Sequence, residues 1–300
     1  MQHIVCRQNA SMRRIDKDAN RAFYDSKLPA ERSRFQVDPS KLHTAELLVP
    51  WVLAALNPGD GVLDVAGGAG SYASEIVRRA DVSIVGIDIS EAMVRQRRED
   101  RLLSENAVAD MEALPFGADA FDAAMVVAAL HHVPDPLPAL REILRVLRPG
   151  GILLAYEPCS LTARRAGRKE VAGMSHEFAV SRPWLLAQIR AAGFVIRTVR
   201  GANLVVRALA PLTGPPSLRV YRAADRVDRF AFLVPGLAGL GKVAMISASK
   251  PGSGVQVEAA TAYACPRCRV SLEPAGSTLA CPNCSHVYDV RDGVPLLVLD

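Results

Sequence analysis

Acidic side chains flank a short run of small residues in this sequence, and together they could bind a nucleotide. Asp64 lies in the apolar run 61–65, residues 66–70 read Ala-Gly-Gly-Ala-Gly, and Asp88 ends the next apolar run. Small residues let the chain turn tightly and let a ligand approach the backbone without meeting a Cβ. A carboxylate at the end of the following strand suits ribose hydroxyls. The pattern indicates a nucleotide-like ligand at this loop.

The elements around the loop must hold it at the edge of a sheet. The apolar runs 61–65 and 84–88 predict buried parallel strands, and residues 71–79 predict the helix between them. Such a βαβ unit places a ligand at the carboxyl ends of the strands. Further strands are expected to end at residue 110 and to cover residues 121–127 and 152–156. The predicted fold class is α/β, with a Rossmann-like doubly wound sheet.

The loop alone leaves the kind of nucleotide open. Residues 68–73 also fit the loose glycine fingerprint of dinucleotide-binding proteins. A pyrophosphate needs free backbone N–H groups and no anion beside them, yet Asp64 stands just ahead of the loop. Its carboxylate suits a ligand that carries an ammonium or sulfonium group. Asp88 could bind a ribose in either ligand.

The motifs further along the chain distinguish the two. Asp110 is followed by Met-Glu-Ala-Leu-Pro-Phe, His131 and His132 follow the fourth expected strand, and Arg-Pro-Gly-Gly occupies residues 148–151. Over roughly residues 45–160 this series resembles the class I S-adenosylmethionine-dependent methyltransferases. The loop is most similar to that of the ubiquinone and menaquinone biosynthesis branch.

The resemblance implies a domain order and a donor site. A helical cap over residues 1–44 would contain Phe23-Tyr24-Asp25, with Tyr24 either near the methionine end or packed, and the methyltransferase domain would span residues 45–250. Asp64 would face the methionine ammonium, Asp88 the ribose, and Asp110 the adenine amino group. The other donor contacts implied are the backbone of Ala66, Gly67, Gly68, Gly70 and Met111 and the side chains of Ile89 and Met93. Ala66 departs from the glycine that many relatives carry.

The implied reaction is in-line displacement of the sulfonium methyl by an acceptor oxygen, nitrogen or carbon. Alignment of the acceptor and exclusion of water can supply most of the rate, about 7–11 kcal/mol, so a base is optional. If one is used, His131 is the first candidate, because histidine titrates in the useful range, with His132 and Glu157 next. The alternative is that the histidine pair caps or packs against the following helix.

A second chemical signal lies near the end of the printed sequence. Two Cys-x2-Cys pairs, Cys265/Cys268 and Cys281/Cys284, are separated by twelve residues. Four thiolates at such spacing are typical of a closed structural zinc site. A pair of disulfides, a rubredoxin-type iron site and a redox dithiol pair are the alternatives. Residues 263–300 resemble the small zinc-ribbon family that includes the activator subunit of RNA- and protein-methylating enzymes, with 251–262 as the expected linker.

Whole-chain properties fit an ordinary enzyme with a modest basic surplus. The formal net charge is +5, and half of the 300 residues are hydrophobic. No apolar run reaches the roughly 18 residues of a membrane span, and the N-terminus lacks a signal-peptide pattern, so we expect a cytoplasmic protein. Arginine clusters at 95–98, 164–169 and 219–229 are interpreted as solvated helix faces, with nucleic-acid contact as the alternative.

The sequence therefore predicts an S-adenosylmethionine-dependent methyltransferase that acts on a small molecule, quinone-like or a specialised metabolite, with a fused ribbon that stabilises or gates it. The enzyme alternative is an RNA methyltransferase that holds its substrate with the ribbon and the arginine clusters. A non-catalytic cofactor-binding scaffold is the third hypothesis. The tetrapeptide that many amide- and base-methylating enzymes carry after the fourth strand is missing here, which favours a small acceptor.

Overall fold

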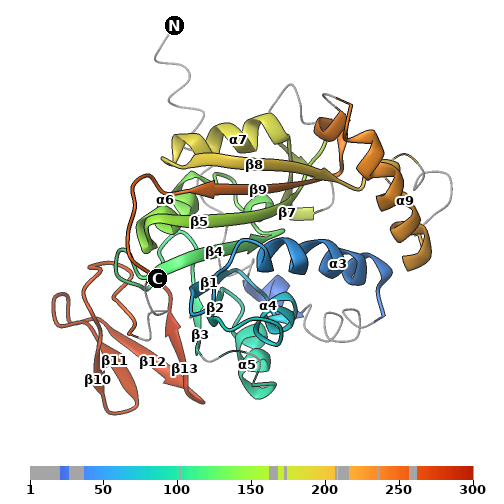
Figure 1. Ribbon diagram of the computed structural model, residues 1–300. Helices are drawn as coiled ribbons and strands as arrows, with labels where there is room; N and C mark the ends of the chain where they lie inside the picture. The colour runs from blue at the N-terminus through green and yellow to red at the C-terminus, as the bar shows by residue number, and fades with distance from the viewer. Residues whose placement is uncertain are drawn as a thin grey trace, which may run out of the picture.

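The computed structural model describes residues 21–26, 37–101, 103, 105–161, 168–171, 174–206, 208, 216–234, 237–256 and 262–299. Residues 1–20 and 27–36 of the expected cap, the Arg164–Arg165 pair and residues 257–261 of the expected linker lie outside this part of the chain. The Rossmann-like class predicted from the sequence is confirmed. Figure 1 shows one twisted sheet that runs through the molecule, with helices on both of its faces.

The central sheet has the strand order β3-β2-β1-β4-β5-β9-β8. β1 pairs in parallel with β2 and β4, β4 with β5, and β2 with β3, whereas β9 runs antiparallel to both β5 and β8. The chain order reverses beside β1, which is the switch point where doubly wound folds bind ligands. The strands are β1 (Gly61–Val65), β2 (Ser83–Asp88), β3 (Glu105–Ala109), β4 (Phe121–Val127), β5 (Leu147–Pro158), β8 (Val195–Ala202) and β9 (Val243–Ser249).

Helices cover the two faces of this sheet and give it two apolar cores. Leu48 and Ile76 belong to the core on one face, and Leu140 and Ile189 to the larger core on the other. The strands of the centre are buried on both sides, so they read as continuous apolar runs. The helices are α3 (Pro39–Leu53), α4 (Ser71–Val77), α5 (Glu91–Glu99), α6 (Leu137–Val146), α7 (Arg182–Ala191) and α9 (Leu218–Ala231). The short elements are η1 (Leu130–His132), η2 (Leu237–Leu240), β6 (Arg168–Val171) and β7 (Met174–Val180).

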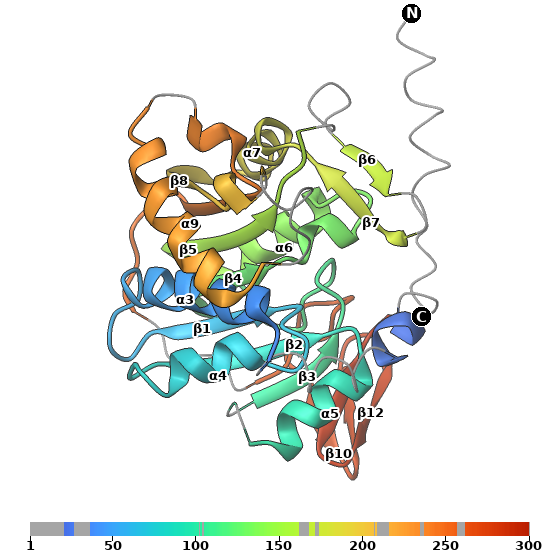
Figure 2. The ribbon, with the colours of Figure 1, turned by 90° about the vertical axis from the view of Figure 1, so that its right-hand side faces the viewer.

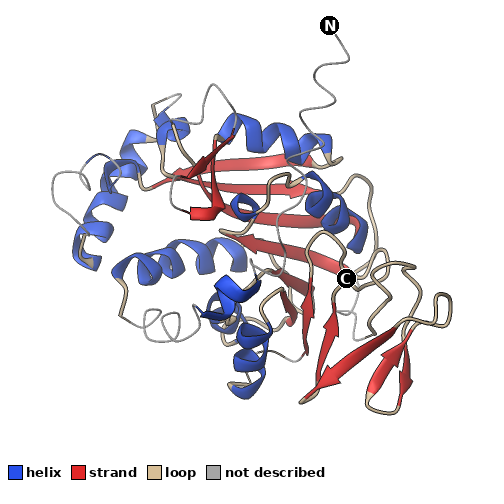
Figure 3. Ribbon diagram, turned by 180° about the vertical axis from the view of Figure 1, so that it is seen from behind, coloured by secondary structure: helices blue, strands red, loops and turns tan. Residues whose placement is uncertain are grey.

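The cysteine-containing segment adds four strands to the same sheet. β10 (Glu273–Ala275), β11 (Thr278–Ala280), β12 (Val287–Arg291) and β13 (Val294–Leu297) pair in antiparallel order. β13 then pairs in parallel with β3, with Leu296 opposite Val108 and Leu297 opposite Ala109. The result is an eleven-stranded sheet that passes from the ribbon into the central sheet, as Figure 3 shows from behind.

Apolar and polar contacts both join the ribbon to the rest of the chain. Val294 forms a small core with Val94 and Val108, and Leu297 lies in the larger core, with neither side chain exposed. Arg95 pairs with Asp292 at 2.6 Å, and Arg269 pairs with Glu142 at 2.7 Å. A unit of this size buries too little surface to be stable alone, so the shared core supplies what the ribbon lacks.

Among the residues that the structure describes, no helix combines the length and the apolar character needed to cross a bilayer.

The shared core predicts that the ribbon and the central sheet unfold together. Leu297→Ala removes a fully buried side chain at this junction, and we expect it to lower the free energy of unfolding by about 2–5 kcal/mol. Val287→Ala is the matched control, because that ribbon side chain is 53% exposed. Urea unfolding followed by circular dichroism measures both. Equal stability of the two variants would show that the ribbon lies outside the cooperative unit.

Candidate active site and metal centre

The loop after β1 has the backbone conformation that its small residues permit. Ala66, Gly68 and Gly70 have φ values of 52°, 54° and 75°. The N–H of Gly67 donates to the carbonyl of Ile87 at 3.1 Å, which ties the loop to the end of β2. A Cβ on Gly67 would lie 1.9 Å from Oδ2 of Asp64, whereas one on Gly68 would meet nothing within 4 Å. The loop is therefore packed on its inner side and open at Gly68.

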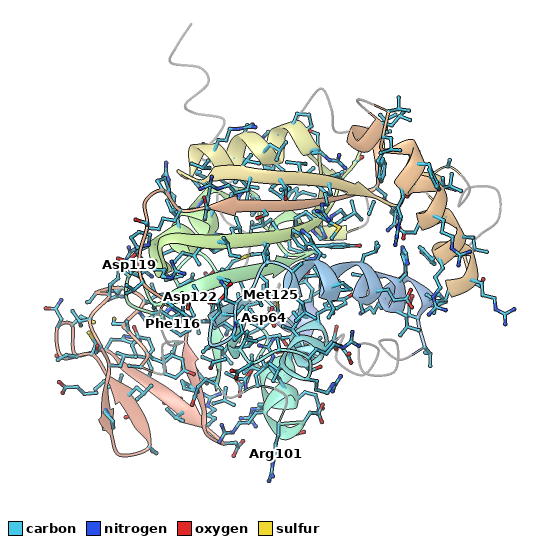
Figure 4. All side chains as sticks on the ribbon, viewed as in Figure 1. Asp64, Arg101, Phe116, Asp119, Asp122 and Met125 are labelled. Carbon is cyan, nitrogen blue, oxygen red and sulfur yellow. The ribbon has the colours of Figure 1, made fainter. Side chains whose placement is uncertain are left out.

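Asp64 lies beneath the loop, opposite Arg97, one of the arginines of the cluster 95–98. Figure 4 shows Asp64 beside Met125, its register partner on β4, in the middle of the sheet. Nη2 of Arg97, from α5, is 3.9 Å from Oδ2 of Asp64, and both side chains are almost completely buried. Arg97 also donates to the carbonyl of Gly68. A Cβ on Gly86 would lie 1.6 Å from Nη1 of Arg97, so the glycine in β2 makes room for the guanidinium.

Burial sets the ionisation of the two acids nearest the loop. Desolvation raises the pKa of Asp64 to about 6, against the attraction of Arg97 and with a smaller contribution from the neighbouring Asp88. Desolvation also raises the pKa of Asp88, while hydrogen bonds from the backbone of Ser90 and Gly68 and the charge of Arg97 oppose the shift. The charged forms of Asp64 and Asp88 therefore cost free energy in the folded chain, and the arginine beside them is only partly hydrogen-bonded. Within the described residues, Nε and Nη1 of Arg97 are buried and have no hydrogen-bond partner.

The residues expected to bind the donor come together from three adjacent strand ends. Oδ2 of Asp88 accepts from the N–H of Gly68 at 2.7 Å, and Oδ1 accepts from the N–H of Ser90 at 2.9 Å. Ile89 and Met93 follow in the turn and first helical residues, where Ser90 caps α5. Asp110 lies at the end of β3, and its Oδ1 accepts from the N–H of Glu112 at 2.9 Å. Met111 packs against the larger core.

A helical turn at residues 21–26 lies against this region. Oδ1 of Asp25 accepts from Oγ of Ser90 at 2.5 Å and from the N–H of Ala92 at 3.2 Å. The ring of Tyr24 meets the ring of His132 edge to face, with centroids 5.4 Å apart. This turn therefore connects the start of α5 to the histidine pair, and it is the described part of the expected cap.

The three expected catalytic residues also meet, at the ends of β4 and β5. Glu157 is fully buried, and its Oε2 lies 2.9 Å from Nδ1 of His131. Its Oε1 accepts from the N–H groups of Ala129 and Leu130 at 2.9 and 2.8 Å. The rings of His131 and His132 are 4.0 Å apart. Glu157 thus fixes the orientation of His131, and Nε2 is the ring atom through which His131 could exchange a proton.

The four cysteines form one cluster whose geometry suits a tetrahedral metal. Their sulfur atoms lie within 4.8 Å of one another, with 3.9 Å between Cys265 and Cys284. Zn–S bonds of about 2.3 Å place tetrahedral sulfurs about 3.8 Å apart. Burial opposes ionisation of Cys265, but hydrogen bonds from the hydroxyl of Tyr288 and from the backbone N–H groups of Cys268 and Arg267 lower the pKa of its thiol to about 6. A thiolate is the form that binds metals.

Two family models match the chain. Residues 63–155 match the methyltransferase domain model, and residues 264–293 match the Trm112p-like protein model. Residues 63–155 are therefore similar to a methyltransferase domain and residues 264–293 to a Trm112p-like protein, within one chain. Both similarities confirm the resemblance inferred from the motifs.

Curated relatives resemble the methyltransferase part of the chain. The C-methyltransferase UbiE of ubiquinone and menaquinone biosynthesis from Geobacter sulfurreducens is 38% identical over 131 residues, which are 41% of this chain and 49% of the relative. The 27-O-demethylrifamycin SV methyltransferase of Amycolatopsis mediterranei is 34% identical over 152 residues, which are 46% of this chain and 55% of the relative. The chain thus spans about half the length of the curated relatives that it matches.

Solved structures share the fold at lower identity. The [4+2]-cyclase SpnF has a TM-score of 0.59 at 24% identity, over 81% of this chain and 99% of its own. The complex between the Haloferax volcanii Trm112 methyltransferase activator and the putative methyltransferase has a TM-score of 0.54 at 19% identity, over 76% of this chain and 97% of the matched one.

The sequence places Asp25 in the expected cap but does not indicate its contacts, and it places Arg97 in the cluster 95–98, which we interpreted as a solvated face. That interpretation is wrong for Arg97, which is fully buried, whereas Arg95 stays partly exposed and pairs with Asp292 of the ribbon. The helical period could have indicated Arg97, since Met93 and Val94 of the same helix face the interior. Asp25 had no signal, because its partners lie 65 and 67 residues away.

The buried carboxylate of Asp64 predicts a gain in stability when its charge is removed. Its pKa of about 6 lies above the value of about 3.9 in an unfolded chain, so the folded state keeps a proton that the unfolded state has lost. Stability therefore falls as pH rises from 4 to 6, and the loss persists above 6. We expect Asp64→Asn to be more stable than the parent, without donor, by roughly 2–3 kcal/mol at pH 7 and by little near pH 4.

Asp122→Asn is the matched control on the neighbouring strand. Asp122 is buried too, but it pairs with Arg148 and accepts from the N–H of Gly61 at 2.9 Å, so its neutralisation should lower stability. Urea unfolding at several pH values measures both variants. A destabilised Asp64→Asn at pH 7 would contradict the assigned cost of the Asp64 charge.

Proposed function

We propose that this protein transfers the methyl group of S-adenosylmethionine to a small, largely apolar acceptor, quinone-like or a specialised metabolite. The observation that carries the proposal is the junction of Asp88 with the open loop at Gly68, directly above the buried Asp64. The acceptor class rests on the similarity to the UbiE and rifamycin methyltransferases. The solved geranyl diphosphate C-methyltransferase of Streptomyces coelicolor, with a TM-score of 0.51 at 22% identity over 70% of this chain and 76% of its own, shares the fold.

The residues present fit the donor. Gly68 has open space where a Cβ would stand, Asp64 and Asp88 lie against the loop, and Asp110 follows the neighbouring strand β3. Asp64 would balance the ammonium through the loop, Asp88 would accept from the ribose, and Asp110 from the adenine amino group. The backbone of Ala66, Gly67, Gly68, Gly70 and Met111 and the side chains of Ile89 and Met93 would complete the pocket. When bound, S-adenosylmethionine supplies a methyl group on a cationic sulfur, which is a good leaving group.

The chain's own part in the reaction is alignment and proton removal. As the acceptor atom bonds to the methyl carbon, the electrons of the carbon–sulfur bond pass to sulfur. His131 would take the acceptor's proton at Nε2, while Glu157 holds Nδ1 and stabilises the charged ring. Tyr24 and His132 would help to exclude water from the same region. Glu157 would be a positioning residue, because it is fully buried and engaged with two backbone N–H groups.

Activity and binding measured together test this function. We expect the purified protein to bind S-adenosylmethionine in calorimetry and to pass a labelled methyl group to a component of the small-molecule fraction of a cell extract. His131→Ala should keep donor binding but reduce the rate about 10²–10⁴-fold. Asp88→Ala should weaken donor binding about 10–100-fold, because it loses charge-assisted hydrogen bonds.

Asp289→Ala, an exposed ribbon substitution, is the control that should change neither property. Absence of donor binding in the parent protein would refute the proposal. A labelled product found only in the RNA fraction would replace the acceptor class by the RNA alternative.

We also propose that the four cysteines hold a structural zinc ion that supports the donor site. The ribbon reaches that site through β13, which pairs with Val108 and Ala109 just before Asp110. Loss of the metal would loosen β13 and then the end of β3. This arrangement fits a stabilising module, and it makes the proposed domain boundary near residue 262 a division within one sheet.

Metal analysis tests the zinc site. Freshly purified protein should contain one equivalent of zinc, and Cys281→Ser should lose it and unfold at lower temperature. Cys159→Ser is the matched control, because Cys159 is buried like Cys281 but lies outside the cluster. Mass spectrometry of the metal content and a thermal melt measure both. Protein that contains iron, or that contains no metal, would contradict the assignment.

The RNA alternative has less support from the structure. One of its three arginine clusters, residues 95–98, serves contacts within the chain, since Arg97 is buried and Arg95 binds the ribbon. The cluster at 219–229 lies on α9. The outer face of α9 also has exposed apolar side chains, which RNA binding would leave unexplained.

A further inference from the structure

Helix α9 lies at the same edge of the sheet as the loop after β1. β8 and β5 are both antiparallel to β9, so β8 runs in the same direction as β5. α9 follows the carboxyl end of β8, just as the loops of the site follow β1, β4 and β5. Figures 1 and 2 show it on the outer flank of the molecule, beside α3.

The inner face of α9 is firmly attached. Asp228 is buried, and its two oxygens accept from the N–H groups of Leu204 and Val205 at 2.8 and 2.9 Å. Tyr221 stacks on His43 of α3 with ring centroids 4.9 Å apart, and Arg222 pairs with Glu46 of the same helix. The helix is therefore a fixed element that holds its outer face in a constant orientation.

The outer face of α9 and the turn after it is apolar to an unusual degree. Five of the ten large hydrophobic side chains recorded as exposed among the described residues lie in this one segment: Val220, Val227, Phe230, Leu233 and Val234. Phe230 is 74% exposed and Leu233 is 78% exposed. Val220 and Val227 are seven residues apart, so they share one side of the helix, and Phe230 follows on its flank. A contiguous apolar surface of this kind marks an interaction site.

Positive charge lies alongside the apolar side chains. Arg219, Arg226 and Arg229 are exposed on α9, and at 100° per residue they fall on a stripe next to the apolar one. The segment 218–234 has four arginines and two aspartates. Asp228 is buried away from the surface, and Asp225 pairs with Arg229 at 3.0 Å, so Arg219 and Arg226 carry the unbalanced charge of the stripe. A helix with an arginine stripe beside exposed Phe and Leu side chains is typical of attachment to an anionic membrane surface.

We propose that the outer face of residues 218–234 binds the surface of an anionic lipid bilayer. Phe230, Leu233 and Val227 enter the boundary between headgroups and acyl chains, and the arginine stripe lies at the lipid phosphates. Nucleic acid would complement the arginines but would leave Leu233 and the valines in water. A lipid surface accounts for both stripes, so the charge and the apolar area favour it together.

This binding would place the acceptor side of the sheet near a membrane. A quinone-like acceptor could then reach the site from the lipid, a consequence that rests on the proposed function. The membrane contact itself does not depend on methyl transfer, because it uses none of the residues assigned to donor binding or proton removal. The two proposals can therefore fail separately.

Sedimentation with vesicles tests the membrane contact. The full chain, without donor, is mixed with vesicles of phosphatidylcholine alone or of phosphatidylcholine with phosphatidylglycerol, and the bound fraction is measured at increasing salt. We expect binding to the anionic vesicles that decreases with salt. Phe230→Ser combined with Leu233→Ser should weaken it about tenfold or more. Arg219→Glu combined with Arg226→Glu should abolish the preference for phosphatidylglycerol.

Matched controls distinguish binding by this surface from nonspecific binding to vesicles. Val255→Ser removes an equally exposed side chain elsewhere, and Arg190→Glu reverses an exposed charge on α7, so both should bind vesicles like the parent. Absence of vesicle binding in the parent at low salt would overturn the proposal. So would full binding by the Phe230/Leu233 variant. Two further results, each without vesicle binding, would also overturn the proposal. One is a dimer that the Phe230/Leu233 substitutions dissociate, and the other is salt-sensitive binding of RNA. Either would assign the surface to another partner.

Discussion

The burial of the Asp64 carboxylate beneath the glycine loop is the constraint from which much of the geometry around this loop follows. A buried charge is costly unless another charge lies close by, and Arg97 of α5 is the group that supplies it. The arginine can reach Asp64 only because β2 has a glycine at position 86, and it also holds the carbonyl of Gly68. The loop, β2 and α5 are therefore fixed relative to one another by one charge and its partner. The raised pKa of Asp64 shows that this compensation is incomplete. A ligand with an ammonium group would complete it.

Strand pairing connects the region around this loop to the ribbon. β1 and β2 hold the loop, β3 holds Asp110, and β13 pairs with β3. An unpaired edge strand exposes backbone groups that can pair with other chains. In this protein the Trm112p-like strands cover that edge, and their cysteine cluster lies in the same core as the sheet. The cysteine cluster and the loop after β1 are thus parts of one structural unit, although their motifs lie far apart in the sequence.

Local patterns predicted much of this structure. The apolar runs around Asp64 and Asp88 indicated parallel strands, because the hydrophobic pattern of a buried strand appears in consecutive residues. The spacing of the cysteines is likewise a local pattern, and it indicated the cluster. The packing of β13 on β3 could not be predicted, since Val294 and Val108 carry no mutual signal in one sequence. Arg97 was misread because arginine on a helix is most often solvated, and its burial depends on the absent side chain of Gly86. The contacts of Asp25 were missed because, in one sequence, an acid that hydrogen-bonds to the start of a distant helix resembles any surface acid.

The continuity of β13 with β3 also bears on how the two parts could be regulated. A separate domain that paired with this edge would occupy it to an extent that depends on the concentration of that domain. Here the ribbon is tethered to its own sheet, so its effective concentration at that edge is set by the chain and not by expression. Leu296 and Leu297 pair with β3, so this edge is occupied from within the chain. Because both strands belong to one chain, the occupancy of this edge follows from folding and does not change with protein concentration.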